Sequence, residues 1–550
     1  MRTEEENREI AQLLFPEVGE SVEDIFKRYP RRKLKDSQLV VRFAPSPTGF
    51  LHVGSVYTSL INRKLADQTD GICILRIEDT DKKREIEGGI DLIINGLERF
   101  GIKFDESVKK GEYGPYIQSE RKEIYKVFAK NMIARGCAYP CFASEEELEE
   151  IRKKQSESGV RTGYYGKWAL WRDAKVEDVK RALNEGKRFV VRLYSTGNFN
   201  NKFTFNDLIK GNCTFSENDM DIVLLKSDGL PTYHFAHPID DTLMGINLVI
   251  RTYEWFPSVP LHLEIFDKLG FKRINYAHPA PLMKMDKGNK RKLSKRKDPE
   301  ADASFFLHQG YPQVGMLEYF LSIMNSNFED WRIQNPSLPY TDFELKLEKF
   351  NKAGALFDMV KLSDVCKEYI SRLSAEQVYN FVLEWAKEFD MDIYNRMINN
   401  KGYCISIFNI EREGDKKRKD MSKWSDVKEQ FKIFFDDMFN DMKKDVLDMD
   451  RGLQINILKE FLATYYYGDS STEWFDKIKR IAQDNGFAID YKEYEKEPSK
   501  YKGKVGDVAG VIRVAVTGRK QSPDLYQVMQ VMGDSRVRDR IEKYINNLQG

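Results

Sequence analysis

The sequence has few cysteines and no long apolar run, and these absences exclude several classes of protein. Its 550 residues include 6 cysteines, scattered without the paired spacing of a disulfide framework, which fits the reducing cytosol. No apolar run approaches the roughly 20 residues of a membrane-spanning helix. The acidic N-terminus, which reads Met-Arg-Thr-Glu-Glu-Glu-Asn, lacks the apolar core of a signal peptide. We therefore expect a cytoplasmic protein with no membrane partner.

The chain also lacks a strong net charge. It has 88 Lys and Arg against 87 Asp and Glu, for a formal net charge of +1. A nucleic-acid-binding protein of this balance must gather its basic side chains on one face. Hydrophobic residues make up 41% of the chain, which indicates a globular protein. Because single cores rarely grow beyond roughly 250–300 residues, the length predicts three or more domains.

A structural zinc site is not expected. Cys137 and Cys141 lie close together, but residues 142–212 contain neither Cys nor His. Four ligands cannot be assembled locally from this segment. We therefore expect no metal held by the protein itself.

A proline-rich turn before a histidine is the most informative motif of the chain. Residues 45–49 read Pro-Ser-Pro-Thr-Gly, and His52 and Gly54 follow. An apolar run precedes the turn and helical periodicity follows it, the order in which an α/β fold presents a nucleoside triphosphate to a helix N-terminus. His52 can donate to phosphate oxygens, and Gly54 lacks the Cβ that would block a base. The motif predicts use of ATP, and the alternative is a purely structural turn.

A basic stretch is the second candidate for nucleotide chemistry. Residues 292–297 read Lys-Leu-Ser-Lys-Arg-Lys, inside the wider basic segment 284–297. Serine and glycine keep such a loop mobile, and adjacent ammonium groups suit a polyphosphate whose charge shifts during a reaction. Without His52, a solvated surface loop would be the better interpretation. The fold must bring the two distant motifs together.

An arginine at the end of a predicted strand is the third candidate. Arg251 follows an apolar pair, and a guanidinium at a strand end can form a bidentate fork for a carboxylate. A salt bridge to Asp240 or Glu254 is the alternative, and the spacing alone leaves both interpretations open.

The pattern of apolar residues predicts an α/β protein with a helical second half. Helical spacing covers an N-terminal arm over residues 1–38. Strands are expected at 39–43 and 72–77, with a helix between them, which makes a βαβ unit. The nucleotide fold is expected to resume near residue 221, and from about residue 310 onward the pattern is helical almost throughout.

Several motifs together resemble those of class I aminoacyl-tRNA synthetases, in their glutamyl form. Residues 42–54 resemble the HIGH signature of that family, and residues 292–296 look like its KMSKS loop. Residues 76–81 match its Arg-Ile-Glu-Asp-Thr-Asp, and residues 114–121 match its Gly-Pro-x-x-Gln-Ser-Glu-Arg. Residues 512–518 look like the last helical domain of the bacterial-type enzymes.

This resemblance implies an architecture. The expected parts are an N-terminal helical extension (1–38), a class I Rossmann-type nucleotide-binding catalytic domain in two halves (39–115 and 222–256), an inserted acceptor-stem-binding domain (116–221), a stem-contact region with the KLSKR loop (257–355), and an α-helical anticodon-binding region (356–550).

The resemblance also implies a reaction. ATP activates L-glutamate to a glutamyl-adenylate, pyrophosphate leaves, and the glutamyl group passes to tRNA-Glu with release of AMP. Mg2+ accompanies the triphosphate, and a monomer is expected. The alternative is an enzyme that also charges tRNA-Gln. A glutaminyl enzyme fits less well, because Arg251 and a helical C-terminal half both favour the glutamyl form.

Site residues follow from the resemblance by position. The expected catalytic residues are His52, Gly54, Lys292 and Lys295. The expected ATP-binding residues are His52, Gly54, Ser294 and Lys295. The expected glutamate-binding residues are Arg42, Ser46, Glu78, Tyr233, His237 and Arg251. Of these, Arg251 faces the side-chain carboxylate, and His237 replaces the usual asparagine, which alters a contact with the amino acid.

Overall fold

The computed structural model describes the whole chain except residues 1, 83–84, 295 and 415–416. The chain divides into two compact units: unit 1 comprises Met1–Phe305 and Leu317–Asp358, and unit 2 comprises the segment Phe306–Met316 with Met359–Gly550. The division after Asp358 lies close to the expected start of the helical region at residue 356. The segment 306–316 groups with the later helices, although we expected it in the region before them.

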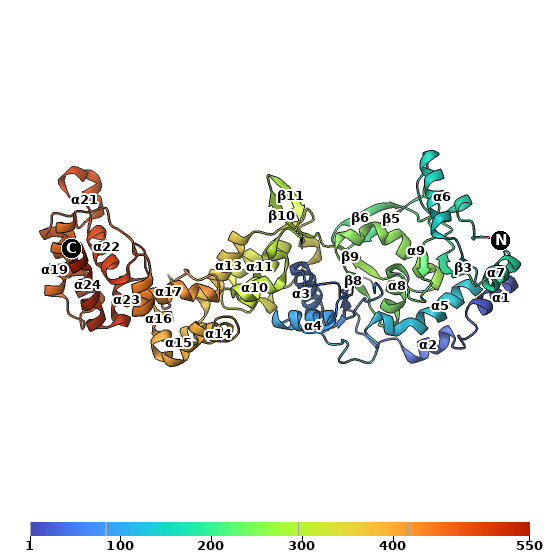
Figure 1. The fold of residues 1–550 in the computed structure, drawn as a ribbon, viewed down its shortest axis with the longest axis horizontal. Helices are drawn as coiled ribbons and strands as arrows, with labels where there is room; N and C mark the ends of the chain where they lie inside the picture. The colour runs from blue at the N-terminus through green and yellow to red at the C-terminus, as the bar shows by residue number, and fades with distance from the viewer. Residues whose placement is uncertain (1, 83–84, 295, 415–416) are drawn as a thin grey trace. The chain divides into compact units, whose positions relative to one another are not determined.

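The N-terminal arm is helical, as predicted. Its helices are α1 (Glu4–Leu14) and α2 (Val22–Arg28), and each begins with a capping box. Ile10 of α1 and Ile25 of α2 are fully buried in one apolar cluster with α5 (Lys122–Ala134). Helix α1 packs beside α5 and α7 (Val176–Asn184) in unit 1 (Figure 1). The arm is therefore a built-in part of this unit.

Parallel strands form the centre of the predicted nucleotide fold. Strand β1 (Val40–Phe43) pairs in parallel with β2 (Ile72–Leu75), and helix α3 (Val53–Gln68) connects them. Strand β8 (Leu248–Ile250) pairs in parallel with β9 (Asn275–Ala277), and helix α9 (Val259–Leu269) connects those. Strands β1 and β8 lie side by side. Their buried apolar residues confirm the expected βαβ unit.

The strand expected to resume the nucleotide fold has a different partner. Strand β7 (Val223–Leu225) pairs antiparallel with β4 (Val190–Leu193), which in turn pairs with β3 (Ala138–Cys141). The expectation for β7 is therefore corrected: this strand belongs to an antiparallel sheet. Apolar burial explains the choice, because Leu224 and Val191 share one buried cluster with α5.

Two hairpins flank the parallel strands. Strands β5 (Lys202–Asp207) and β6 (Gly211–Ser216) form one, and β10 (Leu282–Asp286) and β11 (Asn289–Lys292) form the other. The second has a two-residue turn in which both Lys287 and Gly288 have positive φ, as a type I′ turn requires. Strand β12 (Ala355–Leu356) pairs with β10. Part of the basic segment expected as a loop is therefore a β-hairpin.

The other helices of unit 1 are α4 (Gly89–Arg99), α6 (Glu145–Glu157), α8 (Tyr233–Leu243) and α12 (Phe328–Gln334). Helices α10 (Ala303–Gln309) and α11 (Gln313–Met324) run across the division between the units.

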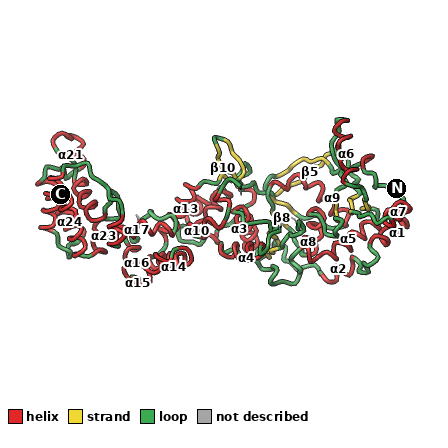
Figure 2. The backbone as a smooth tube through the Cα atoms, viewed as in Figure 1, coloured by secondary structure: helices red, strands yellow, loops and turns green. Residues whose placement is uncertain are grey.

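Unit 2 is built from helices around its own apolar core. From Met359 onward they are α13 (Met359–Arg372), α14 (Ala375–Phe389), α15 (Met391–Asn399), α16 (Lys401–Asn409), α17 (Val427–Phe434), α18 (Asp436–Asp441), α19 (Arg451–Thr464), α20 (Ser471–Asp484), α21 (Tyr491–Lys496), α22 (Val505–Thr517), α23 (Leu525–Met532) and α24 (Asp534–Gln549). Over the described residues, all assigned strands lie in unit 1 (Figure 2). No described helix combines the length and hydropathy of a membrane span.

Candidate active site

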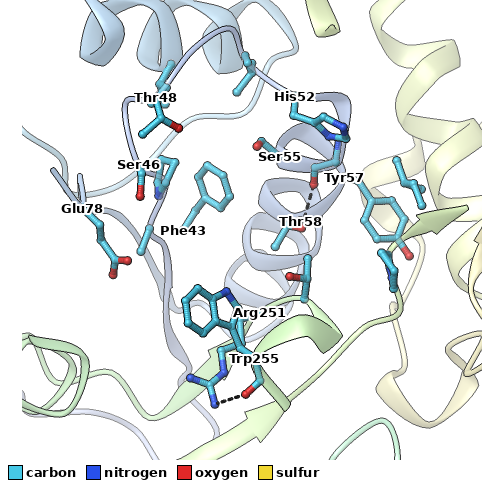
Figure 3. Close-up of a pocket in the computed structure, with 18 of the residues that line it drawn as sticks. Phe43, Ser46, Thr48, His52, Ser55, Tyr57, Thr58, Glu78, Arg251 and Trp255 are labelled. Atoms are coloured by element: carbon cyan, nitrogen blue, oxygen red, sulfur yellow. Dashed lines mark hydrogen bonds between the residues drawn. The ribbon is translucent and has the colours of Figure 1, made fainter. Parts of the chain in front are cut away.

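A cavity of about 730 Å³ opens where β1, β2 and β8 end, the edge at which open α/β sheets bind ligands. Predicted site residues that line it are Arg42, Ser46, His52, Gly54, Glu78, Tyr233, Arg251, Lys292 and Ser294. Figure 3 shows His52 beside the first turn of α3 and Arg251 toward the other end of the view. The fold thus brings together motifs that lie far apart in sequence. Lys295 lies outside the described residues.

His52 caps the helix that begins beside the cavity. Its Nδ1 accepts a hydrogen bond of 2.9 Å from the backbone N–H of Gly54, at the first turn of α3. In the neutral ring the proton therefore sits on Nε2, which makes that nitrogen a donor. A Cβ at position 54 would lie 2.9 Å from the same Nδ1. A side chain at position 54 would therefore displace the histidine from its capping position.

The basic stretch is anchored by a carboxylate that the sequence motif did not include. Asp298 accepts hydrogen bonds from both Nη atoms of Arg291, at 2.6 and 2.8 Å, and from the backbone N–H of Ser294, at 2.9 Å. These bonds hold the pKa of Asp298 well below its usual value, against the effect of burial. Lys292 forms a half-exposed ion pair with Glu254. Asp298 thus holds Arg291 and Ser294, which stand on either side of Lys292 and Leu293 in the chain.

Arg42 lines the cavity and belongs to a buried cluster of paired charges. Its Nε lies 3.2 Å from Asp241, and Nη1 of Arg76 lies 2.5 Å from the same carboxylate. Burial would raise the pKa of Asp241, but the two guanidinium groups hold it well below the usual value. Arg76 also donates to Glu78 at 3.1 Å. Burial raises the pKa of Glu78, and Arg76 and Arg42 oppose that shift.

Arg251 has a different environment. Its Nε donates to Nε2 of His278 at 2.9 Å, and its Nη1 donates to Nδ1 of His262 at 3.0 Å. Longer bonds of 3.2 and 3.3 Å reach the hydroxyl of Tyr233 and the carbonyl of Trp255. Among the described residues, the predicted alternative of a salt bridge is not found, since Asp240 pairs with Arg121 and Arg76, and Glu254 with Lys292.

The histidines around Arg251 are neutral. Burial, reinforced by the charge of Arg251, lowers the pKa of His234 to about 4 and that of His262 well below its usual value. Burial also lowers the pKa of His278. A buried guanidinium held by neutral acceptors can offer its charge to an anionic ligand. The site therefore combines a helix N-terminus suited to phosphate with a cation suited to a carboxylate.

Comparison with known proteins identifies the family. The family model "tRNA synthetases class I (E and Q), catalytic domain" matches residues 38–335, and "Anticodon binding domain" matches residues 417–545. The chain belongs to the class I tRNA synthetases of the glutamate and glutamine group. This confirms the resemblance and the expected class I fold.

Relatives match this synthetase along its whole length. The glutamate–tRNA ligase of Clostridium perfringens is 45% identical over 98% of this chain and 99% of its own. That of Acetivibrio thermocellus is 46% identical over 98% of this chain and 100% of its own. A crystal structure of a glutamate tRNA ligase from Elizabethkingia meningosepticum, in complex with its amino acid, aligns with a TM-score of 0.71 and 26% identity, covering 93% of this chain and 100% of that one.

One predicted pocket residue of the synthetase lies behind the wall of the cavity. His237 is fully buried and does not line the cavity. Its ring stacks on Tyr233, its Nε2 lies 2.7 Å from the hydroxyl of Tyr276, and its Nδ1 lies 2.6 Å from Asp241. Burial lowers its pKa to about 3. The structure thus places His237 as a support for Tyr233.

Sequence reasoning missed several groups that shape the synthetase site. They are Asp207, His262, His278 and Asp298. Asp207 and His278 lie 71 positions apart. His262 is 11 positions from Arg251 and Asp298 is 4 positions from Ser294, but no motif marks a histidine or an aspartate at those spacings. The one available signal was His278, a histidine between two apolar segments, just before the hairpin of the lysine motif.

Proposed function

We propose that this synthetase is a glutamate–tRNA ligase that attaches L-glutamate to tRNA-Glu through a glutamyl-adenylate. The observation that carries the proposal is Arg251, a buried cation without a carboxylate partner among the described residues, in the cavity that His52 also lines. The full-length match to glutamate–tRNA ligases supports it.

ATP is the nucleotide substrate, and we place its phosphates at the start of α3. Backbone N–H groups at a helix N-terminus attract phosphate, and His52 presents a donor there. Lys292 and Ser294 line the same cavity from the basic segment. We assign Lys295, outside the described residues, to the departing pyrophosphate with Lys292, because cations can stabilise the charge that develops there.

Mg2+ fits this site as a companion of the triphosphate. Glu78 is the carboxylate that lines the cavity, and among the described residues no cluster of three or more candidate ligands is found. Magnesium bound mainly through phosphates and water suits such a lining. When bound, the ion would neutralise phosphate charge.

The reaction needs no nucleophile from the protein. The α-carboxylate of glutamate attacks the α-phosphorus of ATP and pyrophosphate leaves; a terminal ribose hydroxyl of tRNA then displaces AMP from the glutamyl-adenylate. The protein contributes orientation and charge stabilisation. We assign Arg42, Ser46, Glu78 and Tyr233 to the surroundings of the amino acid, since all four line the cavity.

Selection against glutamine follows from hydrogen bonding at Arg251. A glutamine amide would turn its NH2 group toward a guanidinium that can only donate. Sites built around a buried polar partner reject mismatched analogues by up to about 10⁴–10⁵. We infer that Arg251 selects the side-chain carboxylate of glutamate.

A second cavity supports tRNA binding by unit 2. It is about 390 Å³ and lies between α20 and α22, within the range of the anticodon-binding family. Trp474 and Arg513 line it, and Nε1 of Trp474 and Nε of Arg513 are buried donors without a hydrogen-bond partner among the described residues. We assign this cavity to an anticodon base. Residues 116–221 and 257–355 then bind the acceptor arm, in a monomer that acts in the cytoplasm, where proteins are synthesised.

The experiment that tests the function is aminoacylation by the full-length protein with purified tRNA-Glu and tRNA-Gln. We expect charging with glutamate, not glutamine, dependent on ATP and Mg2+, and on tRNA-Glu. Arg513→Gln should raise the KM for tRNA and leave the KM for glutamate unchanged. If neither tRNA yields glutamyl-tRNA, the proposal is overturned. Charging of both tRNAs would instead establish the alternative, an enzyme that also glutamylates tRNA-Gln.

A further inference from the structure

The hydrogen bonds of Arg251 divide into a rigid set and an exchangeable set. Those to His278 and His262 are the short ones, at 2.9 and 3.0 Å, and both rings are fully buried. Those to Tyr233 and Trp255 are longer, at 3.2 and 3.3 Å, and both of these residues line the cavity. A ligand carboxylate can therefore replace the bonds to Tyr233 and Trp255 while the bonds to the two histidines keep the guanidinium in place.

The hydrogen bond from Arg251 to His278 requires one particular tautomer of this histidine. A guanidinium has no acceptor, so Nε2 of His278 must present its lone pair to Arg251. The proton of the neutral ring then sits on Nδ1, which lies 2.6 Å from Oδ2 of Asp207. The carboxylate accepts a hydrogen bond from this N–H and thereby fixes both the tautomer and the ring orientation.

Asp207 is itself held rigidly. It is 1% exposed at the end of β5, where its Oδ1 accepts the backbone N–H groups of Ile209 and Lys210 at 3.0 and 2.9 Å. One carboxylate oxygen thus serves the turn after β5, and the other serves His278. The aspartate cannot rotate toward Arg251 without losing these bonds.

We propose that Asp207 and His278 are positioning residues that orient Arg251 for the side-chain carboxylate of the amino acid. The proposal rests on the proposed function, in which Arg251 contacts glutamate. An aspartate in direct contact would neutralise the guanidinium, as Asp241 does for Arg42 and Arg76. The intervening imidazole transmits orientation without placing a negative charge against the cation.

A purely structural role for the pair is the competing explanation. The turn after β5 also bonds to β9 through the backbone N–H of Leu208 and the carbonyl of Tyr276, at 2.9 Å. Asp207 and His278 could therefore serve only to hold the hairpin against the parallel strands. That role predicts a loss of stability without a selective effect on glutamate.

Asp207→Asn separates the two explanations. If the amide oxygen keeps the turn, the NH2 group faces Nδ1 of His278 and forces the proton onto Nε2. Two donors then oppose each other at Arg251. In aminoacylation at saturating ATP and tRNA, we expect the KM for glutamate to rise about tenfold or more, the cost of one mismatched buried bond, with kcat and the KM for ATP little changed.

A second change should rescue the first. Glutamine has no tautomers, so in the double variant Asp207→Asn, His278→Gln the amide oxygen at position 278 can accept from Arg251 whatever the group at 207 does. We expect the double variant to have a lower KM for glutamate than Asp207→Asn alone. His278→Leu, which offers no acceptor, should raise that KM at least as much as Asp207→Asn does.

Asp221→Asn is the matched control, a fully buried aspartate of the same unit outside the cavity. Asp221 accepts hydrogen bonds from Tyr139, the backbone of Ser195 and Arg172, none of which lines the cavity. The KM for glutamate of this variant should therefore stay at the wild-type value. An unchanged KM in Asp207→Asn and His278→Leu, an equal rise in the control, or no rescue would overturn the positioning role. An unchanged KM in Arg251→Gln would instead remove Arg251 from the pocket and reject that part of the proposed function.

Discussion

Two arginines at the ends of neighbouring strands differ in what surrounds their charge. Arg42, on β1, lies against the fully buried carboxylate of Asp241, which it shares with Arg76. Arg251, just after β8, is bonded to two imidazoles, a hydroxyl and a carbonyl, all of them neutral. Both arginines are nearly inaccessible to solvent, at 3% and 5% exposure.

The difference separates a charge that a carboxylate of the protein neutralises from one that is left for a ligand to neutralise. Removing one partner of a buried ion pair leaves an uncompensated charge. The protein tolerates such a charge at Arg251, and neutral hydrogen-bond acceptors reduce its cost. Tolerance of that cost is explained if the missing counter-charge arrives with the substrate.

Arg251→Gln should produce the largest effect. We expect kcat/KM for glutamate to fall by about 10⁴, since a site built for one polar partner then loses it. Stability should not fall, because the substitution removes a buried charge that lacks a partner. Aminoacylation kinetics and urea denaturation measure the two quantities. A severe loss of stability with unchanged kinetics would show that Arg251 serves the fold alone.

Asp241→Asn should have the opposite signature. Its loss leaves Arg42 and Arg76 without their shared carboxylate, and breaking such a buried pair costs about 3–5 kcal/mol. Urea denaturation of the variant measures this cost. Asp70→Asn is the control, because its ion pair with Lys35 is exposed and should contribute less than about 1 kcal/mol. Equal losses in both variants would contradict the distinction.

The histidines should make the Arg251 region sensitive to mild acid. His237 has a folded pKa of about 3 against 6.5, so between these values the unfolded state binds more protons. Stability is then lost as pH falls below 6.5, by up to about 1.4 kcal/mol per pH unit. The contribution of Asp241, whose pKa is depressed, is lost only below about pH 4.

His237→Asn should therefore reduce the slope of the free energy of unfolding against pH between pH 6.5 and 4. The reduction should correspond to about one fewer proton bound on unfolding. Denaturation midpoints collected across this range give the slope. An unchanged slope would mean that His237 is already protonated in the folded state.

Glu254→Gln should have the smallest effect. Glu254 and Lys292 form an ion pair that is about half exposed on both sides, and such pairs contribute about 0–1 kcal/mol. We expect the free energy of unfolding to change by less than about 1 kcal/mol. A larger loss of unfolding free energy in urea denaturation would show that this pair stabilises the fold, as the buried pairs of Asp241 do.

The sequence was sufficient for local elements and for motifs with a chemical signature. Hydrophobic periodicity and turn residues predicted β1, α3 and β2. The strand-end position marked Arg251, which lines the cavity, as a candidate but left a salt bridge equally open. These features depend on neighbours a few positions away. The partner of β7 was missed, because pairing with β4 is decided by burial in three dimensions.

The support of the site could not be predicted for the same reason. Asp207 and His278 are 71 positions apart, and His278 is 27 positions from Arg251. Only the register of β8 with β9 and the placement of the β5 hairpin bring them together. The chain has six histidines, and four of them surround Arg251, yet their spacing in sequence follows no motif.

The central claim is that the charge of Arg251 is left for a substrate carboxylate to neutralise. Its most direct test is thermal unfolding of the wild-type protein and Arg251→Gln, each with and without L-glutamate. A ligand at 100 times its Kd stabilises the folded state by about 2.7 kcal/mol. We predict that glutamate, but not glutamine, raises the melting temperature of the wild type, that it leaves Arg251→Gln unchanged, and that the ligand-free variant melts no lower than the wild type. An equal rise with glutamate in both proteins would contradict the account.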